Sequence, residues 1–216
     1  MVENYKILYR GGSGELTEKK SRFLADLRPV SSEEEALAFI EEIRKRYWDA
    51  RHHCFAYIIG DRGQTARCSD DGEPSQTAGK PMMDVLAGEE LHDVCAVVTR
   101  YFGGTLLGTG GLVRAYSGAV KEGLRDCVAV EKRLAVRLRV TTDYNGVGKL
   151  QYLAAREGID ILDTQYTDQA VFTFLVPVRA EGQFTARITE GTAGRAAIHR
   201  EDQVYYGLAE GELVVF

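Results

Sequence analysis

The sequence has no apolar run near the roughly 18 residues that a membrane span needs. Its N-terminus has neither the basic start nor the apolar stretch of a signal peptide. The 4 cysteines form no Cys-x-x-Cys pair, which argues against a zinc knuckle or a disulfide framework and favours reduced, mostly buried thiols. We therefore expect a cytoplasmic protein with no membrane partner and no bound metal.

The familiar catalytic motifs are also missing. The chain contains no His-Glu-x-x-His, no Gly-x-Ser-x-Gly and no Gly-Lys-Ser/Thr string. Basic residues are not in excess either, because 27 Lys and Arg face 32 Asp and Glu, giving a net charge of −5. A familiar hydrolase is therefore disfavoured, we assign no catalytic residue and no cofactor, and any nucleic-acid site has to be a local basic patch.

The chain has 216 residues, of which 44% are hydrophobic and 27% charged, as expected for one large or two small globular domains. In the first half, Ser32 begins a capping box, and a tightly spaced apolar face follows it. The predicted elements are strands over 22–28, 53–59 and 94–102, a helix over 33–47, and a helix carrying Leu112 to Leu124. The nearly uninterrupted apolar strand 94–102 is expected at a central position, buried on both faces.

The pattern restarts after the charged residues 131–133. The predicted order is strand 134–141, helix 146–157, strand 159–166, strand 170–178, helix 181–189 and strand 196–205. This βαββαβ order is that of a ferredoxin-like domain. We predict an α+β protein with domains 1–130 and 131–216, joined near 128–133.

Two irregular segments carry the candidate functional residues. Residues 68–82 are predicted to form a loop, in which Asp70, Asp71 and Glu73 either make an ordinary turn or hold a divalent cation or a basic partner. The run 103–111 has five glycines just before a helix. The glycines either permit tight turns and close packing, or leave backbone N–H groups open to an anion. Arg100 and Arg114 favour the anion.

The adjacent His52 and His53 lie on a predicted strand, where neighbouring side chains point to opposite faces, so they are poorly placed to chelate one metal. Arg51 precedes them, and Arg44 to Arg46 end the helix before them as a solvated basic end. We assign a focused basic patch to Arg51, Lys80, Arg100 and Arg114, although Arg100 and Arg114 could instead pair with nearby carboxylates.

Four strings in order resemble the IMPACT family, and the two-domain length resembles its bacterial YigZ-type members. They are Lys20 to Phe23, Ala50 to Cys54, Ser69 to Pro74 with Thr77 to Met82, and Thr99 to Gly104 with Leu107 to Tyr116. The resemblance implies an N-terminal α/β domain similar to a ribosomal-protein domain and to domain IV of elongation factor G. It implies a ferredoxin-like C-terminal domain similar to the last domain of elongation factor G.

The resemblance also implies a role in translation, because eukaryotic relatives regulate it, and it carries no settled enzyme activity. We expect a non-catalytic regulator that binds structured RNA, the ribosome or a translation-related protein. The alternative is an enzyme that binds a phosphorylated small molecule or nucleotide at the glycine-rich turn. The candidate binding residues are Arg51, His52, Asp70, Asp71, Glu73, Lys80, Arg100, Gly103, Gly104, Gly108, Thr109, Gly110, Gly111 and Arg114.

Overall fold

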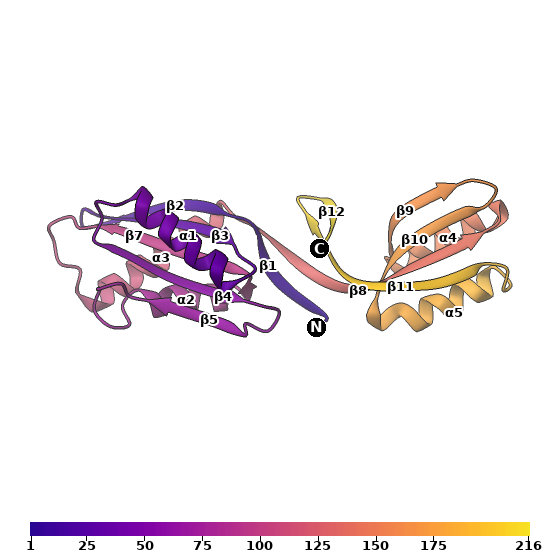
Figure 1. Cartoon of the computed structure of the whole chain (residues 1–216), viewed down its shortest axis with the longest axis horizontal. Helices are drawn as coiled ribbons and strands as arrows, with labels where there is room; N and C mark the ends of the chain where they lie inside the picture. Colours follow the sequence, from indigo (N-terminus) through magenta and orange to yellow (C-terminus); the bar gives the residue numbers. More distant parts are fainter. The chain divides into compact units, whose positions relative to one another are not determined.

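The computed structural model describes residues 1–216 and divides into two compact units. Unit 1 is Met1–Glu131 with Ala209–Glu212, and unit 2 is Lys132–Leu208 with Leu213–Phe216. The predicted α+β class is confirmed, because each unit packs helices on a sheet (Figure 1). No helix is long and apolar enough to cross a membrane.

Unit 1 is built on a five-stranded antiparallel sheet in the order β2-β3-β7-β4-β5. A further strand pair, β1 with β6, runs parallel. The strands of this unit are β1 (Asn4–Arg10), β2 (Gly12–Glu18), β3 (Ser21–Pro29), β4 (His52–Ile59), β5 (Thr65–Ser69), β6 (Leu91–His92) and β7 (Val94–Tyr101). As predicted, β7 lies in the middle of the sheet and its residues from Val94 to Arg100 are buried.

Helices cover both faces of this sheet. On one face lies α1 (Glu33–Arg46), which begins at the predicted cap: the Ser32 side chain accepts from the Glu35 N–H. On the other face lie α2 (Gly79–Gly88) and α3 (Gly108–Arg125), whose apolar residues pack against alternate residues of β3, β4 and β7. Side chains at the even positions of β4 and β7 therefore point toward α2 and α3.

The first helical turn of α2 lies inside residues 68–82, which we expected to be entirely loop, so that expectation is wrong. Its N-cap residue, Ala78, has no side chain able to cap, and Pro81 stands in the first turn, where proline is tolerated because that N–H has no helical partner. The Asp70 carboxylate accepts from the N–H groups of Ala78 and Gly79 instead. A residue eight positions upstream thus supplies the missing cap.

Unit 2 has the predicted ferredoxin-like order, because β8, α4, β9, β10, α5 and β11 follow one another along the chain. In the sheet β10 lies between β8 and β9, and β11 pairs with the other edge of β8, all antiparallel. The elements are β8 (Val128–Thr142), α4 (Tyr144–Glu157), β9 (Asp160–Tyr166), β10 (Ala170–Pro177), η1 (Val178–Ala180), α5 (Glu181–Gly191), β11 (Ala197–Ala209) and β12 (Glu212–Val215).

The expected joint at residues 128–133 is not an irregular linker. These residues are the first part of the 15-residue strand β8, and the division between the units falls after Glu131 within that strand. The short segment Ala209–Glu212, far along the chain, also belongs to unit 1. The domain bounds 1–130 and 131–216 stay a prediction.

Candidate functional site

Three side chains form a row at one end of the unit 1 sheet. Arg100 on β7 pairs in register with Phe23 on β3 and with His52 on β4. All three lie on the face that α2 and α3 cover, because their neighbours two residues along belong to that core. The row marks the place where β7 ends and β4 begins.

The Arg100 guanidinium is held deep in this row. Its Nη1 donates to Oε1 of Glu73 at 2.6 Å, and the Arg100 and Glu73 side chains are only 8% and 4% exposed. The Tyr116 hydroxyl on α3 donates to the same carboxylate oxygen at 2.8 Å. The guanidinium carbon lies 5.5 Å from the ring centres of both Phe23 and Phe102. Nε is buried and has no hydrogen-bond partner.

The loop 70–78 positions Glu73 through its own hydrogen bonds. Asp70 Oδ1 accepts from the N–H groups of Ala78 and Gly79 at 2.9 and 2.8 Å, and Oδ2 accepts from Gln76 N–H at 2.7 Å. Partial burial raises the pKa of the Asp70 carboxyl, but the three N–H donors outweigh it and the net pKa is lowered. The Cys54 thiol on β4 donates to the Asp70 carbonyl at 3.0 Å and ties the loop to the sheet.

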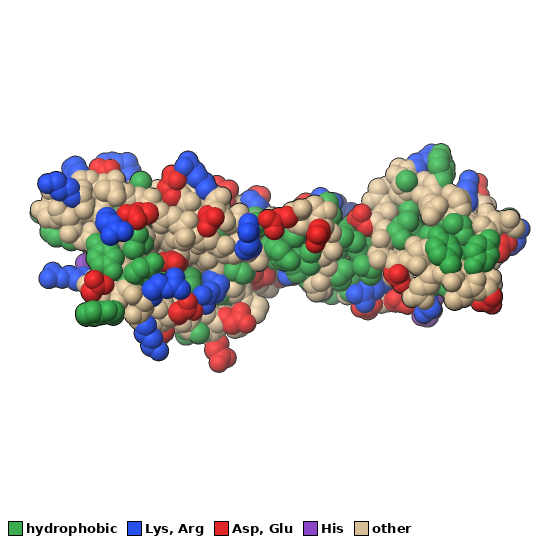
Figure 2. Space-filling view, turned by 90° about the horizontal axis from the view of Figure 1, so that it is seen from above, with side chains coloured by type: hydrophobic (Ala, Val, Ile, Leu, Met, Phe, Trp, Pro, Cys, Tyr) green, Lys and Arg blue, Asp and Glu red, His purple; other side chains and the backbone are tan.

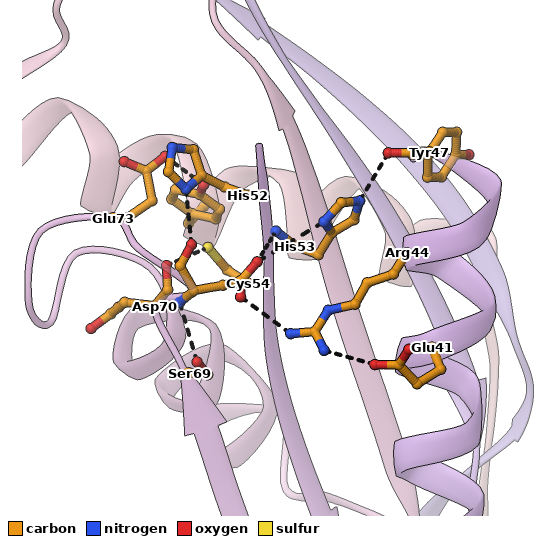
Figure 3. A network of polar contacts seen from close by, with 11 residues as sticks. Glu41, Arg44, Tyr47, His52, His53, Cys54, Ser69, Asp70 and Glu73 are labelled. Atoms are coloured by element: carbon orange, nitrogen blue, oxygen red, sulfur yellow. Dashed lines mark hydrogen bonds and ion pairs between the residues drawn. The ribbon is translucent and has the colours of Figure 1, made fainter. Parts of the chain in front are cut away.

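Asp71 connects this loop to the opposite face of the sheet, where Arg44 of α1 also donates to Glu41, as Figure 3 shows. Its Oδ2 accepts from the His53 N–H at 2.7 Å, and its Oδ1 accepts from Arg44 of α1 at 3.2 Å. The two histidines lie on opposite faces, as predicted. His52 Nδ1 lies 2.9 Å from the Asp71 carbonyl oxygen, and since a carbonyl can only accept, that nitrogen carries the proton. The three carboxylates of the loop therefore have separate structural partners.

A cleft of about 470 Å³ opens at the end of the row. Apolar surface is unusually accessible there, because Phe102 is 56% exposed and Leu106 is 82% exposed. The residues that line the cleft are Asp49, Ala50, Arg51, His52, Arg100, Tyr101, Phe102 and Leu106. Three candidates from the sequence, Arg51, His52 and Arg100, thus come together in one cleft.

The glycine-rich run has two structural roles. Gly103 packs against the chain, since a Cβ there would lie 2.0 Å from the Lys20 carbonyl carbon. Gly104 and Gly108 adopt φ of 84° and 70°, which favour glycine. Gly108, Thr109, Gly110 and Gly111 form the first turn of α3 rather than a turn before it.

The N-terminus of α3 has no side-chain cap, because its N-cap residue is Leu107. Gly108, Thr109 and Gly110 are exposed there. The nearest atom to a Cβ placed on Gly110 would be Nη1 of Arg114, at 3.6 Å. The first-turn N–H groups and one guanidinium therefore lie together on the surface.

The four residues of the predicted basic patch differ in their exposure and in their partners. Arg51 and Arg114 are exposed, but Arg100 is buried with Glu73, and Lys80 pairs with Asp84 on α2. For Arg100 the structure therefore bears out the alternative, an ion pair with a nearby carboxylate, whereas Lys80 stays exposed beside its partner. On the face drawn in Figure 2, the Lys and Arg side chains of unit 1 are interspersed with Asp and Glu.

The buried groups behind the cleft are poor nucleophiles at neutral pH. Burial raises the pKa of the Cys54 thiol far above its ordinary value, and burial likewise raises the pKa of the Tyr116 hydroxyl. Both groups stay protonated and act as hydrogen-bond donors. Their arrangement supports the position of Glu73.

Sequence reasoning did not identify the apolar rim of the cleft. The sequence pattern places Phe102 at the end of a buried strand and Leu106 within a glycine-rich run. One signal in the sequence could have indicated this exposed rim. Phe102 and Leu106 lie beside glycines, which have no side chains that could bury them. The sequence indicates Tyr116 only as part of the helix that carries Leu112 to Leu124, because its partner Glu73 is 43 residues away.

Two family models match the chain. Residues 19–124 match the Impact N-terminal domain, and residues 140–195 match a domain of unknown function (DUF1949). The protein YvyE of Bacillus subtilis, described as an IMPACT family member, is 39% identical over 205 residues, which cover 95% of this chain and 94% of that protein. This chain belongs to the IMPACT family.

Other IMPACT proteins match over different lengths. YigZ of Escherichia coli is 37% identical and covers 82% of this chain, with 87% of its own length matched. Protein IMPACT of Bos taurus is 33% identical over 43% of this chain and 30% of its own. A crystal structure described as that of a hypothetical protein has a TM-score of 0.60 and 33% identity, covering 94% of this chain and 99% of that one.

Proposed function

We propose that this IMPACT protein is a non-catalytic, translation-associated regulator that contacts RNA through the cleft of unit 1. The observation that carries the proposal is the cleft itself, where Arg51 and the edge of Arg100 meet exposed Phe102 and Leu106. Cationic and aromatic side chains on one surface are the combination that nucleic-acid backbones and bases bind. A protein acting on translation in this way works in the cytoplasm.

The chemistry around the cleft supports binding rather than catalysis. The carboxylates of Asp70, Asp71 and Glu73 accept hydrogen bonds from the loop, the sheet and Arg100. The Cys54 thiol is buried behind these carboxylates, and burial raises its pKa. A general base or nucleophile has to reach its substrate with a lone pair free, and these groups are used in holding the fold.

A second candidate is an enzyme or carrier that binds a phosphorylated small molecule at the N-terminus of α3. The uncapped first turn Gly108 to Gly111 and the nearby Arg114 favour it. Inorganic phosphate distinguishes the two candidates, because an α3 site would bind it at millimolar concentration and the cleft would not need it. Gly110→Val serves as the control variant.

We expect Arg51→Ala to weaken binding to a structured ribosomal RNA fragment about threefold to tenfold, similarly across sequences. The side chain is exposed and has no carboxylate partner, so its loss should remove about one phosphate contact and reduce the salt slope by about one. Fluorescence anisotropy at several salt concentrations measures both quantities. Arg125→Ala is the control outside the cleft, because Arg125 is exposed at the far end of α3, where it pairs with Glu122.

Equal affinities and slopes for wild type and Arg51→Ala would contradict the assignment of the cleft. Failure of the wild type to bind RNA at low salt would contradict RNA as the partner and favour a translation-related protein. Sedimentation with ribosomes, with and without nuclease treatment, then separates a protein partner from an RNA partner.

A further inference from the structure

We propose that the cleft recognises an unpaired nucleotide of single-stranded RNA, with its base stacked on Phe102. This inference rests on the proposed function and names the form of RNA that fits the site. The fixed position of Arg100, the balance of charge in the cleft and the exposed ring of Phe102 support it.

The Arg100 guanidinium lies against one face of the Phe102 ring, and the rest of the ring remains accessible. The guanidinium carbon lies 5.5 Å from the Phe102 ring centre, and Glu73 and Phe23 hold the guanidinium in place. The Phe102 side chain nevertheless remains 56% exposed. A ring that a fixed cation supports on one side is already held in place. When a base stacks on its open side, the protein therefore loses little conformational entropy.

The charges in and behind the cleft argue against a site that holds phosphates alone. Arg51 and Arg100 are matched by two carboxylates, Asp49 in the lining and Glu73 behind it. Duplex RNA offers mainly phosphates and hydroxyls to a protein surface, because its bases are stacked within the helix. An unpaired strand also offers base faces, and only these can use the apolar area of Phe102 and Leu106.

Arg100 lines the cleft, but its side chain is only 8% exposed and its charge is neutralised by Glu73. Nη1 is used by Glu73, whereas Nε is buried and has no partner. Of the two arginines that line the cleft, Arg51 is the exposed one, so a phosphate of a bound strand would meet Arg51. The volume of about 470 Å³ lies within the roughly 300–1,000 Å³ that bound small molecules occupy.

The test compares one labelled RNA of about ten nucleotides in three forms: single-stranded, annealed to its complement, and with abasic positions. We expect the single strand to bind roughly tenfold more tightly than the duplex or the abasic strand. Phe102→Ala should reduce single-strand affinity by roughly tenfold, while Phe102→Tyr, which keeps a ring, should restore it. Leu37→Ala is the apolar control, because Leu37 is 49% exposed on α1 and outside the cleft lining.

Equal binding of single strand and duplex, or an unchanged affinity of Phe102→Ala, would overturn this inference and leave the proposed RNA function standing. Absence of binding to every form at low salt would overturn both. Circular dichroism and thermal unfolding confirm that the variants are folded, which we expect because the altered side chain is more than half exposed.

Discussion

Glu73→Gln should lower the free energy of unfolding by about 3 kcal/mol, because it leaves the Arg100 guanidinium buried without a negative partner. Both side chains are more than nine-tenths buried, so water cannot replace the lost charge. The same change removes the charged acceptor of the Tyr116 hydroxyl. Urea unfolding followed by circular dichroism measures the difference.

The matched control is Glu15→Gln. Glu15 also pairs with an arginine, Arg22, but the two side chains are 44% and 53% exposed. An exposed ion pair contributes about 0–1 kcal/mol, so this variant should be close to wild type. The double variant Glu73→Leu with Arg100→Met should be more stable than Glu73→Gln alone, since no buried charge remains. Equal stability of Glu73→Gln and Glu15→Gln would refute the buried pair.

Asp70→Asn should cost about 2 kcal/mol at neutral pH, because the carboxylate accepts from three backbone N–H groups and caps α2 from outside the helix. The pKa of Asp70 is lowered in the folded protein. A lowered carboxyl pKa stabilises the fold above the ordinary aspartate pKa of about 4, and this contribution is lost as pH falls through the folded-state value.

The stability difference between wild type and Asp70→Asn should therefore be constant from neutral pH to about pH 5 and shrink below about pH 4. Denaturant unfolding at a series of pH values measures it. Asp168→Asn is the control, because Asp168 is an exposed turn residue that accepts only from the neighbouring Thr167 hydroxyl. A difference that grows on acidification would show that the N–H contacts do not stabilise the ionised form.

The sequence predicted the parts of the fold that depend on local patterns. Helix α1 has its cap and its apolar face within about fifteen residues. The uninterrupted apolar run of β7 itself indicates a central position in the sheet. The order of elements in unit 2 was predictable for the same reason. The start of helix α2 could not be predicted from a local pattern, because its cap, Asp70, lies outside the helix across an irregular loop.

The site was only partly predictable because its contacts are distant in sequence. Arg51, His52 and Arg100 were found from their motifs, and the register of β4 with β7 brings His52 and Arg100 together. No local pattern shows that Glu73 folds inward to Arg100, 27 residues away, and so converts a predicted surface cation into a buried one. Exposure is a tertiary property, so the sequence pattern predicts a buried Phe102 although the structure exposes it.

Photo-crosslinking tests the central claim most directly. A single-stranded RNA containing 4-thiouridine is bound to the full chain at low salt, irradiated and digested, and the modified peptides are identified by mass spectrometry. The account predicts crosslinks at Phe102 or Leu106, with loss of the signal in Arg51→Ala and Phe102→Ala and retention in Arg125→Ala. Crosslinks confined to unit 2, or equal yields in all of these proteins, would contradict it.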